Sequence, residues 1–230
     1  MRGKPTVFVT GFPAGMFQTN CYVLAHEGAS ECVVVDPGQD AFGPLSGFLA
    51  KSGLTPSAVL LTHGHLDHVW NARQVCEEYG VPAYIHPEDR YMLTEPGRAI
   101  GPTLQPFIEG LEFVEPDEVI DLVDGDKIVH AGIEFLVDHT PGHTPGSVVL
   151  RTQADTDEGL VPLALTGDTL FQGSIGRTDL PGGNHQQLLD SLEAKVLILP
   201  DDTVVLPGHG PGTTIGEERR TNPFVAGKAG

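Results

Sequence analysis

Short apolar runs separated by glycine and proline make up most of this chain, and the pattern predicts strands joined by turns. The runs that we expect to form strands are residues 6–9, 21–24, 32–35, 58–61, 81–86, 119–122, 127–129, 133–137, 148–150, 163–165 and 203–206. The third run is apolar without a break, which is typical of a central strand buried on both faces. Turn residues predict a loop or hairpin between the first two strands and a second hairpin region between 119–122 and 127–129.

Apolar residues at helical spacing follow several of these strands. Residues 42–49 predict one helix, residues 68–79 a second and residues 186–199 a third. The second helix lies between two predicted strands, so residues 58–86 are interpreted as a βαβ crossover. Prolines interrupt residues 87–116, and this insertion either closes over a site as a lid or covers the sheet.

Strands accompanied by helices occur in both halves of the chain. This organisation predicts an α/β protein with a single domain over residues 1–230. We expect two similar halves, roughly residues 1–117 and 118–230, whose sheets pack face to face with the helices outside. The acidic loop at residues 155–158 and the tail after Pro223 are expected to be mobile.

The most polar stretch of the chain reads THGHLDH, residues 62–68, and follows the fourth predicted strand. Imidazole nitrogen and carboxylate oxygen both suit a borderline divalent ion such as zinc. In an extended segment, residues two apart project to the same side, so His63 and His65 can bind one ion together. Asp67 continues that row, whereas His68 points elsewhere. The stretch predicts a metal site at a strand's carboxyl end, where open α/β sheets usually place their sites.

Further metal-capable residues follow other predicted strands beside glycines, namely His143, Asp168 and His209. His139 lies four residues before His143, and composition alone does not decide which of the two is a ligand. Asp36 ends the third strand, where it either hydrogen-bonds within a turn or contacts a metal ligand from behind. The donors predict one site that is assembled from distant parts of the chain.

The charge of the chain bears on its partners. The formal net charge is −18 at pH 7, with 13 Lys and Arg against 31 Asp and Glu. An acidic chain repels phosphate backbones, and no local basic run is visible, so nucleic acid is not expected as a partner. The three cysteines are far apart, and no stretch has the length of a membrane span or the pattern of a signal peptide. We therefore expect a soluble cytoplasmic protein without a membrane partner.

The order of the donors resembles the metallo-β-lactamase superfamily, whose hallmark is HxHxDH followed by a distant His, an Asp and a final His. The resemblance covers essentially the whole chain and implies a four-layer αβ/βα sandwich with metals in a groove at the edge of the sheets. The stretches TGDTLF, GRTD and PGHGP, at residues 166–171, 176–179 and 207–211, are similar to bacterial hydroxyacylglutathione hydrolases of the shorter type. Asp168, where antibiotic-hydrolysing lactamases have Cys, also resembles this glyoxalase II branch.

This resemblance implies two divalent metal ions, with zinc as the expected metal and iron or manganese as alternatives. The implied ligands are His63, His65 and His143 for the first ion, Asp67, His68 and His209 for the second, and Asp168 as a bridge between them. Asp67 and Asp168 are also expected to orient a bridging hydroxide during catalysis. Arg177 is interpreted either as a salt-bridge partner or as an anchor for a substrate carboxylate.

The implied centre favours a particular reaction. Two metal ions activate a bridging water at neutral pH, and a leaving thiol with a pKa of about 8.5 departs without a dedicated general acid. No such acid is visible in the motifs. We therefore predict a metal-dependent hydrolase that cleaves the thioester of an S-acyl thiol, such as S-lactoylglutathione, to a hydroxy acid and a free thiol.

Two departures from the longer glyoxalase II enzymes concern the thiol carrier. Those enzymes hold glutathione with a C-terminal helical domain, whereas only 21 residues follow His209 here. Their Tyr shortly after the final His is replaced by Gly210-Pro211-Gly212.

Three other functions compete with thioester hydrolysis. The nearest is a persulfide dioxygenase on the same fold, which uses one non-haem iron held by two His and one Asp. A nucleic-acid phosphodiesterase is disfavoured by the net charge. A structural metal protein is disfavoured because the donors exceed the four of a closed site.

Overall fold

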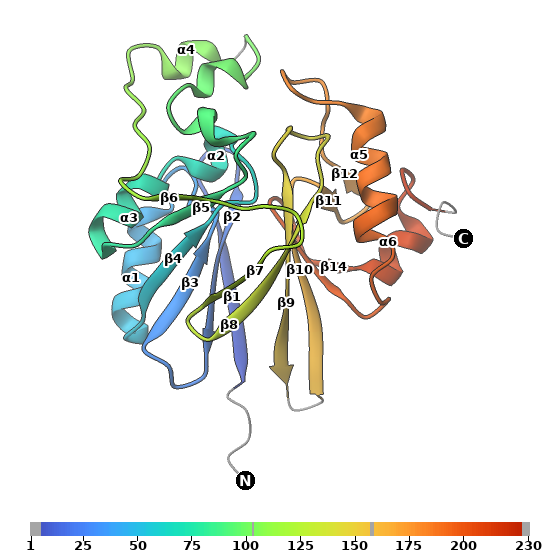
Figure 1. Ribbon diagram of the computed structural model, residues 1–230, viewed down its shortest axis with the longest axis horizontal. Helices are drawn as coiled ribbons and strands as arrows, with labels where there is room; N and C mark the ends of the chain where they lie inside the picture. The colour runs from blue at the N-terminus through green and yellow to red at the C-terminus, as the bar shows by residue number, and fades with distance from the viewer. Residues whose placement is uncertain (1–5, 103, 157–158, 227–230) are drawn as a thin grey trace.

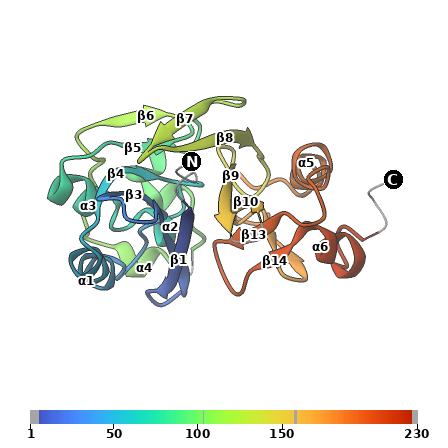
Figure 2. The ribbon, with the colours of Figure 1, turned by 90° about the horizontal axis from the view of Figure 1, so that it is seen from below.

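Two six-stranded sheets lie face to face with helices on their outer sides, in a computed structural model that describes residues 6–102, 104–156 and 159–226 (Figure 1). Seen from below, the layers follow one another as helix, sheet, sheet and helix (Figure 2). The predicted α/β class and four-layer sandwich are therefore confirmed.

The first sheet is formed by the N-terminal part of the chain. Its strands, in spatial order, are β1 (Val7–Ala14), β2 (Thr19–His26), β3 (Glu31–Val35), β4 (Thr55–Leu60), β5 (Ala83–Ile85) and β6 (Val119–Asp121). The first two strands form a long hairpin in which Pro13 pairs with Asn20. Because β1 lies at the edge of the sheet, a proline is tolerated there, and the strand extends beyond the predicted residues 6–9.

The second sheet is formed by the C-terminal part. Its strands, in spatial order, are β14 (Thr213–Thr214), β13 (Val204–Pro207), β10 (Gly159–Gly167), β9 (Val148–Thr156), β8 (Ile133–His139) and β7 (Lys127–His130). The predicted acidic loop at 155–158 is shorter than expected, because β9 and β10 reach residues 156 and 159. Residues 157–158 lie outside the described residues. A small hairpin, β11 (Leu170–Phe171) and β12 (Ser174–Ile175), was not predicted.

The predicted hairpin between residues 119–122 and 127–129 is wrong. β6 pairs in parallel with β5 in the first sheet, whereas β7 pairs antiparallel with β8 in the second. The turn between them is where the chain crosses from one sheet to the other, and Val123 N–H donates to the Asp126 carboxylate within it. The chain therefore passes from the first sheet to the second between residues 121 and 127.

Helices cover the outer face of each sheet. They are α1 (Phe42–Ser52), α2 (Leu66–Val69) and α3 (Ala72–Tyr79) beside the first sheet, and α5 (His185–Ser191), its π-helical continuation η3 (Leu192–Val196) and α6 (Ile215–Thr221) beside the second. The predicted helix at 68–79 is interrupted because Asn71 N–H donates to the carbonyl of Pro37. The predicted helix at 186–199 ends at residue 196, and α6 was not predicted.

The insertion at residues 87–116 stands at the top of the molecule in Figure 1. It contains only short helical segments, η1 (Arg90–Leu93), η2 (Pro96–Arg98) and α4 (Gln105–Ile108). Of the predicted frayed tail, residues 227–230 lie outside the described residues.

Three apolar layers explain why the strands read as continuous apolar runs. Along β3, Val33 and Val35 pack into the layer between the two sheets, whereas Val34 packs into the layer beneath α1 and α3. Along β9, Leu150 faces the other sheet and Val149 faces α5. Because side chains alternate along a strand, a strand covered on both faces needs apolar residues at every position.

The strand directions bring the metal-capable residues to one edge of the sandwich. β3 runs parallel to β4, and β10 runs parallel to β13. β9 is antiparallel to both β8 and β10, so β8 points the same way as β10. Asp36 and the donors at 63–68, 143, 168 and 209 all follow the carboxyl ends of these strands.

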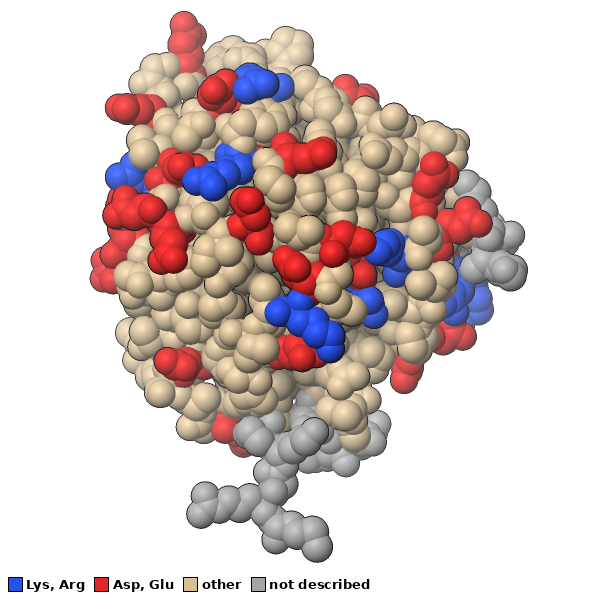
Figure 3. Space-filling model, in the orientation of Figure 1, with Lys and Arg blue, Asp and Glu red and all other residues tan. Residues whose placement is uncertain are grey.

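Among the described residues, no helix is both long and apolar enough to cross a membrane. The face shown in Figure 3 carries many acidic side chains, with a smaller number of Lys and Arg among them.

Phe135 tests the packing between the sheets. Its side chain is fully buried in β8, within the layer that joins the two sheets. We expect Phe135→Ala to lower the free energy of unfolding by about 3–5 kcal/mol, as large-to-small changes in a core do. Val129→Ala, at a position in β7 that is 60% exposed, should change it by less than about 0.5 kcal/mol. Denaturant unfolding followed by circular dichroism measures both, and equal effects would contradict this packing.

Candidate metal centre

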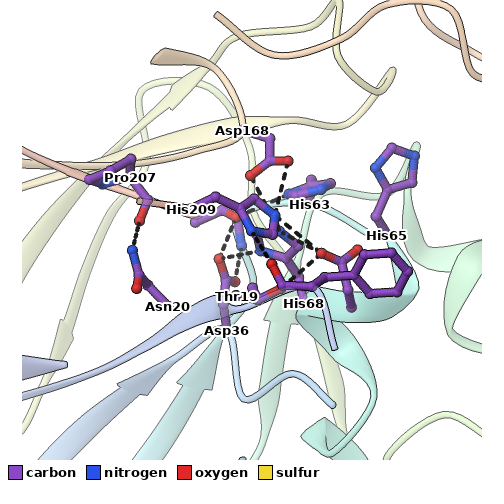
Figure 4. Close-up of polar contacts among 12 residues, drawn as sticks. Thr19, Asn20, Asp36, His63, His65, His68, Asp168, Pro207 and His209 are labelled. Atoms are coloured by element: carbon purple, nitrogen blue, oxygen red, sulfur yellow. Dashed lines mark hydrogen bonds and ion pairs between the residues drawn. The ribbon is translucent and has the colours of Figure 1, made fainter. Parts of the chain in front are cut away.

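The metal-capable residues named from the sequence meet at this edge of the sandwich (Figure 4). Their ligand atoms form three overlapping groups, each within 4.8 Å, namely His63, His65 and His143, then His63, His68 and Asp168, and then Asp67, His68 and His209. No other group of this kind occurs among the described residues. The structure therefore brings together every ligand that the resemblance implied, and the cluster fits a dinuclear metal site.

The first group consists of three buried histidines. Nδ1 of His65 lies 2.9 Å from Nε2 of His143, and the same Nε2 lies 3.5 Å from Oδ2 of Asp168. Nε2 of His63 is buried without a hydrogen-bond partner. A buried polar atom without a partner is costly, and a bound cation would satisfy this lone pair. The donors therefore fit a metal ion.

The group of Asp67, His68 and His209 combines a carboxylate with two histidines. Nε2 of His209 lies 3.2 Å from Oδ2 of Asp67. Nε2 of His68 lies 3.5 Å from the same oxygen of Asp67 and 3.3 Å from Oδ1 of Asp168. Since Asp168 also lies beside His143 of the first group, its carboxylate stands between the two groups.

Hydrogen bonds at Nδ1 turn the imidazoles toward the cluster. His68 Nδ1–H donates to the Asp36 carboxylate at 3.0 Å, and His143 Nδ1–H donates to the carbonyl of Arg177 at 2.7 Å. His209 Nδ1–H donates to the carbonyl of Phe17 at 3.1 Å. With Nδ1 bonded in this way, Nε2 is the ring nitrogen that faces the site, and it can bind a cation when it carries no proton.

Asp36 supports the cluster from behind. Besides His68, its carboxylate accepts hydrogen bonds from the backbone N–H of Thr62 at 2.8 Å and from the Thr62 hydroxyl at 2.6 Å. Its backbone has a φ of 49°, a left-handed conformation that is strained for a residue with a side chain. The sequence left two roles open for Asp36, and the structure shows the contact with an implied metal ligand.

Asp89 supports the site through hydrogen bonds that the sequence did not predict. Its side chain is fully buried and accepts hydrogen bonds from Gly64 N–H at 2.9 Å, Gly146 N–H at 2.7 Å and the Thr144 hydroxyl at 2.6 Å. Burial raises the pKa of this carboxyl, and the three hydrogen bonds oppose that rise. Asp89 thus joins the loop of His63 and His65 to the loop of His143. Its position inside the proline-rich insertion gave no signal of this role.

Gly208 allows a close approach between two segments of the site. A Cβ atom at this position would lie 2.3 Å from Oδ1 of Asp168 and 2.6 Å from Cε1 of His68. Only glycine therefore lets the strand that carries His209 reach the cluster.

The surroundings lower the pKa of some histidines of the cluster and raise that of another. Burial and the neighbouring imidazoles lower the pKa of His63 well below its usual value and that of His65 to about 3, so both are neutral. Burial also lowers the pKa of His68, but the carboxylates of Asp168 and Asp67 outweigh it and raise this pKa well above 6.5. Against the effect of burial, the charge of His68 lowers the pKa of both carboxyls. A bound cation would replace the proton of His68 beside these carboxylates.

His139 lies outside the cluster. Its ring stacks on His86, with the ring centroids 4.0 Å apart, and its Nε2 lies 2.8 Å from the carbonyl oxygen of Pro145. It thereby holds the loop that carries His143, which is the ligand that the family motif selected.

Arg177 lies on the wall of the site, in a cavity of about 480 Å³ that opens over the cluster. Its guanidinium donates two hydrogen bonds to the Asp179 carboxylate, at 2.8 and 2.7 Å. The salt bridge was one of its two expected roles.

Asp89→Asn tests the link between the two loops. An amide group in place of one carboxylate oxygen leaves at least one buried donor without an acceptor, which costs about 1–3 kcal/mol of stability. We also expect metal affinity to fall about 10–100-fold, as for other contacts behind metal ligands. Glu88→Gln, at the exposed neighbouring residue, is the matched control and should change neither. Thermal unfolding and competition with a chelating indicator measure the two effects, and wild-type values in Asp89→Asn would show that the link is dispensable.

Comparisons with known proteins agree with this geometry. The family model of the metallo-beta-lactamase superfamily matches residues 14–209. An uncharacterized protein of Mycobacterium leprae is 55% identical over 222 residues, which cover 96% of this chain and 100% of the relative. The hydroxyacylglutathione hydrolase GloC of Haemophilus influenzae is 36% identical over 222 residues, which cover 94% of this chain and 97% of the relative.

Solved structures give the same result. The BLEG-1 B3 metallo-beta-lactamase has a TM-score of 0.83 at 39% identity and covers 96% of this chain and 100% of its own. TTHA1623 in a di-iron-bound form has a TM-score of 0.74 at 38% identity, covering 94% of this chain and 99% of its own. ETHE1 from Myxococcus xanthus has a TM-score of 0.75 at 27% identity, covering 96% of this chain and 85% of its own. From the matched family model and these relatives, the chain belongs to the metallo-β-lactamase superfamily.

Proposed function

We propose that this protein is a metal-dependent hydrolase that cleaves the thioester of an S-acyl thiol, such as S-lactoylglutathione, to a hydroxy acid and a free thiol. The observation that carries the proposal is the set of overlapping donor groups, with Asp168 between the His143 side and the His209 side, at the floor of an open cavity. A structural metal site is usually closed by four ligands, whereas this cluster offers more donors and faces solvent through the cavity.

The donors would hold two divalent ions, and such ions, when bound, would lower the pKa of a bound water and supply hydroxide near neutral pH. Asp67 and Asp168 are ionised, and their carboxylate oxygens face His209, so they can orient this nucleophile by accepting its hydrogen bond. Thr19 fixes the orientation of Asp67, because its hydroxyl donates to Oδ2 at 2.9 Å.

The walls of the site favour a thioester over an amide. Apart from the implied ligands, the polar residues among those that line the cavity are Gln39, Ser174 and Arg177. None of these is a good proton donor at neutral pH, since Arg remains charged and amides and hydroxyls are very weak acids. An amine leaving group needs a proton, whereas a thiolate leaves without one. The similarity to GloC, a hydroxyacylglutathione hydrolase, supports the same reaction.

Removal of single ligands tests the assignment of two ions. We expect His63→Ala to lose mainly the first ion and His68→Ala mainly the second, because each residue belongs to the corresponding donor group. His185→Ala, at an exposed histidine outside the cluster, should keep both ions. Elemental analysis gives the metals per chain, and the absorption of cobalt-substituted protein distinguishes the nitrogen-rich position from the carboxylate-bearing one. Two tightly bound ions in both cluster variants would refute the division.

A substrate panel on protein of known metal content tests the reaction. With two zinc ions bound, we expect hydrolysis of S-acyl thiols, S-lactoylglutathione included, and loss of that activity after chelation, with recovery when zinc is returned. Released thiol is followed with a chromogenic disulfide. A penicillin serves as the comparison substrate, because the BLEG-1 relative is a B3 metallo-beta-lactamase. Faster cleavage of the penicillin than of every thioester would overturn the proposal.

A persulfide dioxygenase with one iron is the second candidate. His63, His68 and Asp168 form a group of two His and one Asp, the donor set of oxygen-activating non-haem iron enzymes. The di-iron form of a 38% identical structure supports iron binding at such a site. One iron per purified chain, together with oxygen uptake on glutathione persulfide, would favour this candidate over the hydrolase.

A further inference from the structure

The cavity above the metal centre has a polar floor and apolar walls. Its floor is made by implied metal ligands, and much of its apolar wall comes from two parts of the chain. One is the tip of the β1–β2 hairpin, with Met16 and Phe17. The other is the insertion before β6, with Ile100, Leu104, Phe107 and Ile108. The insertion was expected either to close over a site or to cover the sheet, and these four side chains form a wall of the site.

Three of the wall residues expose large apolar surfaces. Met16 is 57% exposed, Phe17 is 42% exposed and Phe107 is 59% exposed. Exposed apolar surface of this kind, gathered around a cavity, is typical of a binding site for an apolar group. Trp70 and Leu180 extend the same lining.

The apolar wall is connected to the metal centre. The carbonyl of Phe17 accepts the hydrogen bond from His209 Nδ1, and Met16 N–H donates to the Gln39 side chain at 3.2 Å. The hairpin tip is therefore held against the site, and a group bound to it lies next to the reacting atoms.

The charges of the cavity do not suit a group with several anionic charges. Arg177 is the one Lys or Arg among the described residues that line the cavity, and the Nε and Nη2 edge of its guanidinium already donates to the Asp179 carboxylate. Glutathione carries two carboxylates, which normally require cations that are free to bind them. The net charge of −18 repels such groups further.

We infer that the substrate is a thioester with an apolar acyl group, aliphatic or aromatic, and that the wall of Met16, Phe17 and Phe107 binds this group. Soluble thiol carriers are polar, so only the acyl side of a thioester can fill an apolar wall. The thiol carrier then lies toward the rim, where Arg177 is its proposed contact. This inference rests on the proposed thioester hydrolase and ranks its substrates: a thioester with an apolar acyl group on a carrier of low charge should be cleaved faster than S-lactoylglutathione, whose acyl group is a small hydroxy acid.

A series of acyl chains on one carrier tests the inference. The probes are the acetyl, butanoyl and hexanoyl thioesters of N-acetylcysteamine, which differ only in chain length. Each buried methylene contributes roughly fourfold to binding, so we expect kcat/KM to rise at least about tenfold from acetyl to hexanoyl. We expect Phe107→Ala to lower the hexanoyl-to-acetyl ratio by roughly fivefold, because it removes apolar contact area. Phe224→Ala changes another exposed phenylalanine, which lies outside the cavity, and this control should keep the ratio.

A binding measurement separates this inference from the proposed reaction. Trp70 is the only tryptophan of the chain and lines the cavity, so its fluorescence reports occupancy without turnover. We expect the non-hydrolysable S-hexyl thioether of N-acetylcysteamine to bind at least about tenfold more tightly than the S-methyl thioether.

The outcomes distinguish the two claims. Preferred binding of the hexyl compound without hydrolysis of any thioester would overturn the hydrolase but support the apolar site. Hydrolysis at rates independent of chain length, with equal binding of both thioethers, would overturn the apolar site and leave the hydrolase standing.

Discussion

The gathering of the Asp36, Asp67 and Asp168 carboxylates and several buried imidazoles in one cluster is the constraint on which the rest of the structure depends. Charged groups out of water are costly unless they are paired and hydrogen-bonded. Here the ionised Asp67 and Asp168 surround His68, whose raised pKa supplies a positive charge in the absence of a metal ion. A pair of cations would balance the charge of the same carboxylates. The same side-chain positions therefore suit both the metal-free protein, in which His68 carries the positive charge, and the metal-bound protein.

This constraint explains why the loops around the cluster are tied to one another rather than only to their own strands. Asp36 joins the loop after β3 to His68 and Thr62, and Asp89 joins the loops of the first donor group. The Asn20 side chain donates to the carbonyl of Pro207, which links the two sheets at the edge that carries the cluster (Figure 4). Donors held in this way need little rearrangement to bind an ion.

The residues around the metal ligands select the substrate that reaches them. The metal ligands form a floor that suits hydrolysis in general, as the range of functions named for its relatives illustrates. Much of the wall comes from segments without ligands, the β1–β2 hairpin tip and the insertion that contains α4. Loops that surround a conserved type of centre set which substrate reaches it, because they contact the parts of the substrate that do not react.

The pattern of residues along the chain predicts the class of fold, which the structure confirms, and it picks out the candidate donors, which the structure places together. Uninterrupted apolar runs such as 32–35 mark strands covered on both faces, and THGHLDH places donors at a strand end because metal binding requires those residue types in close spacing. Only the tertiary structure decided which strands are partners and which side chains hold the donors. Residues 119–121 and 127–130 look like a hairpin, yet they belong to different sheets, since pairing depends on distant strands. Asp89 and the apolar wall were likewise invisible, because hydrogen bonds and cavities between residues far apart in the chain leave no local pattern.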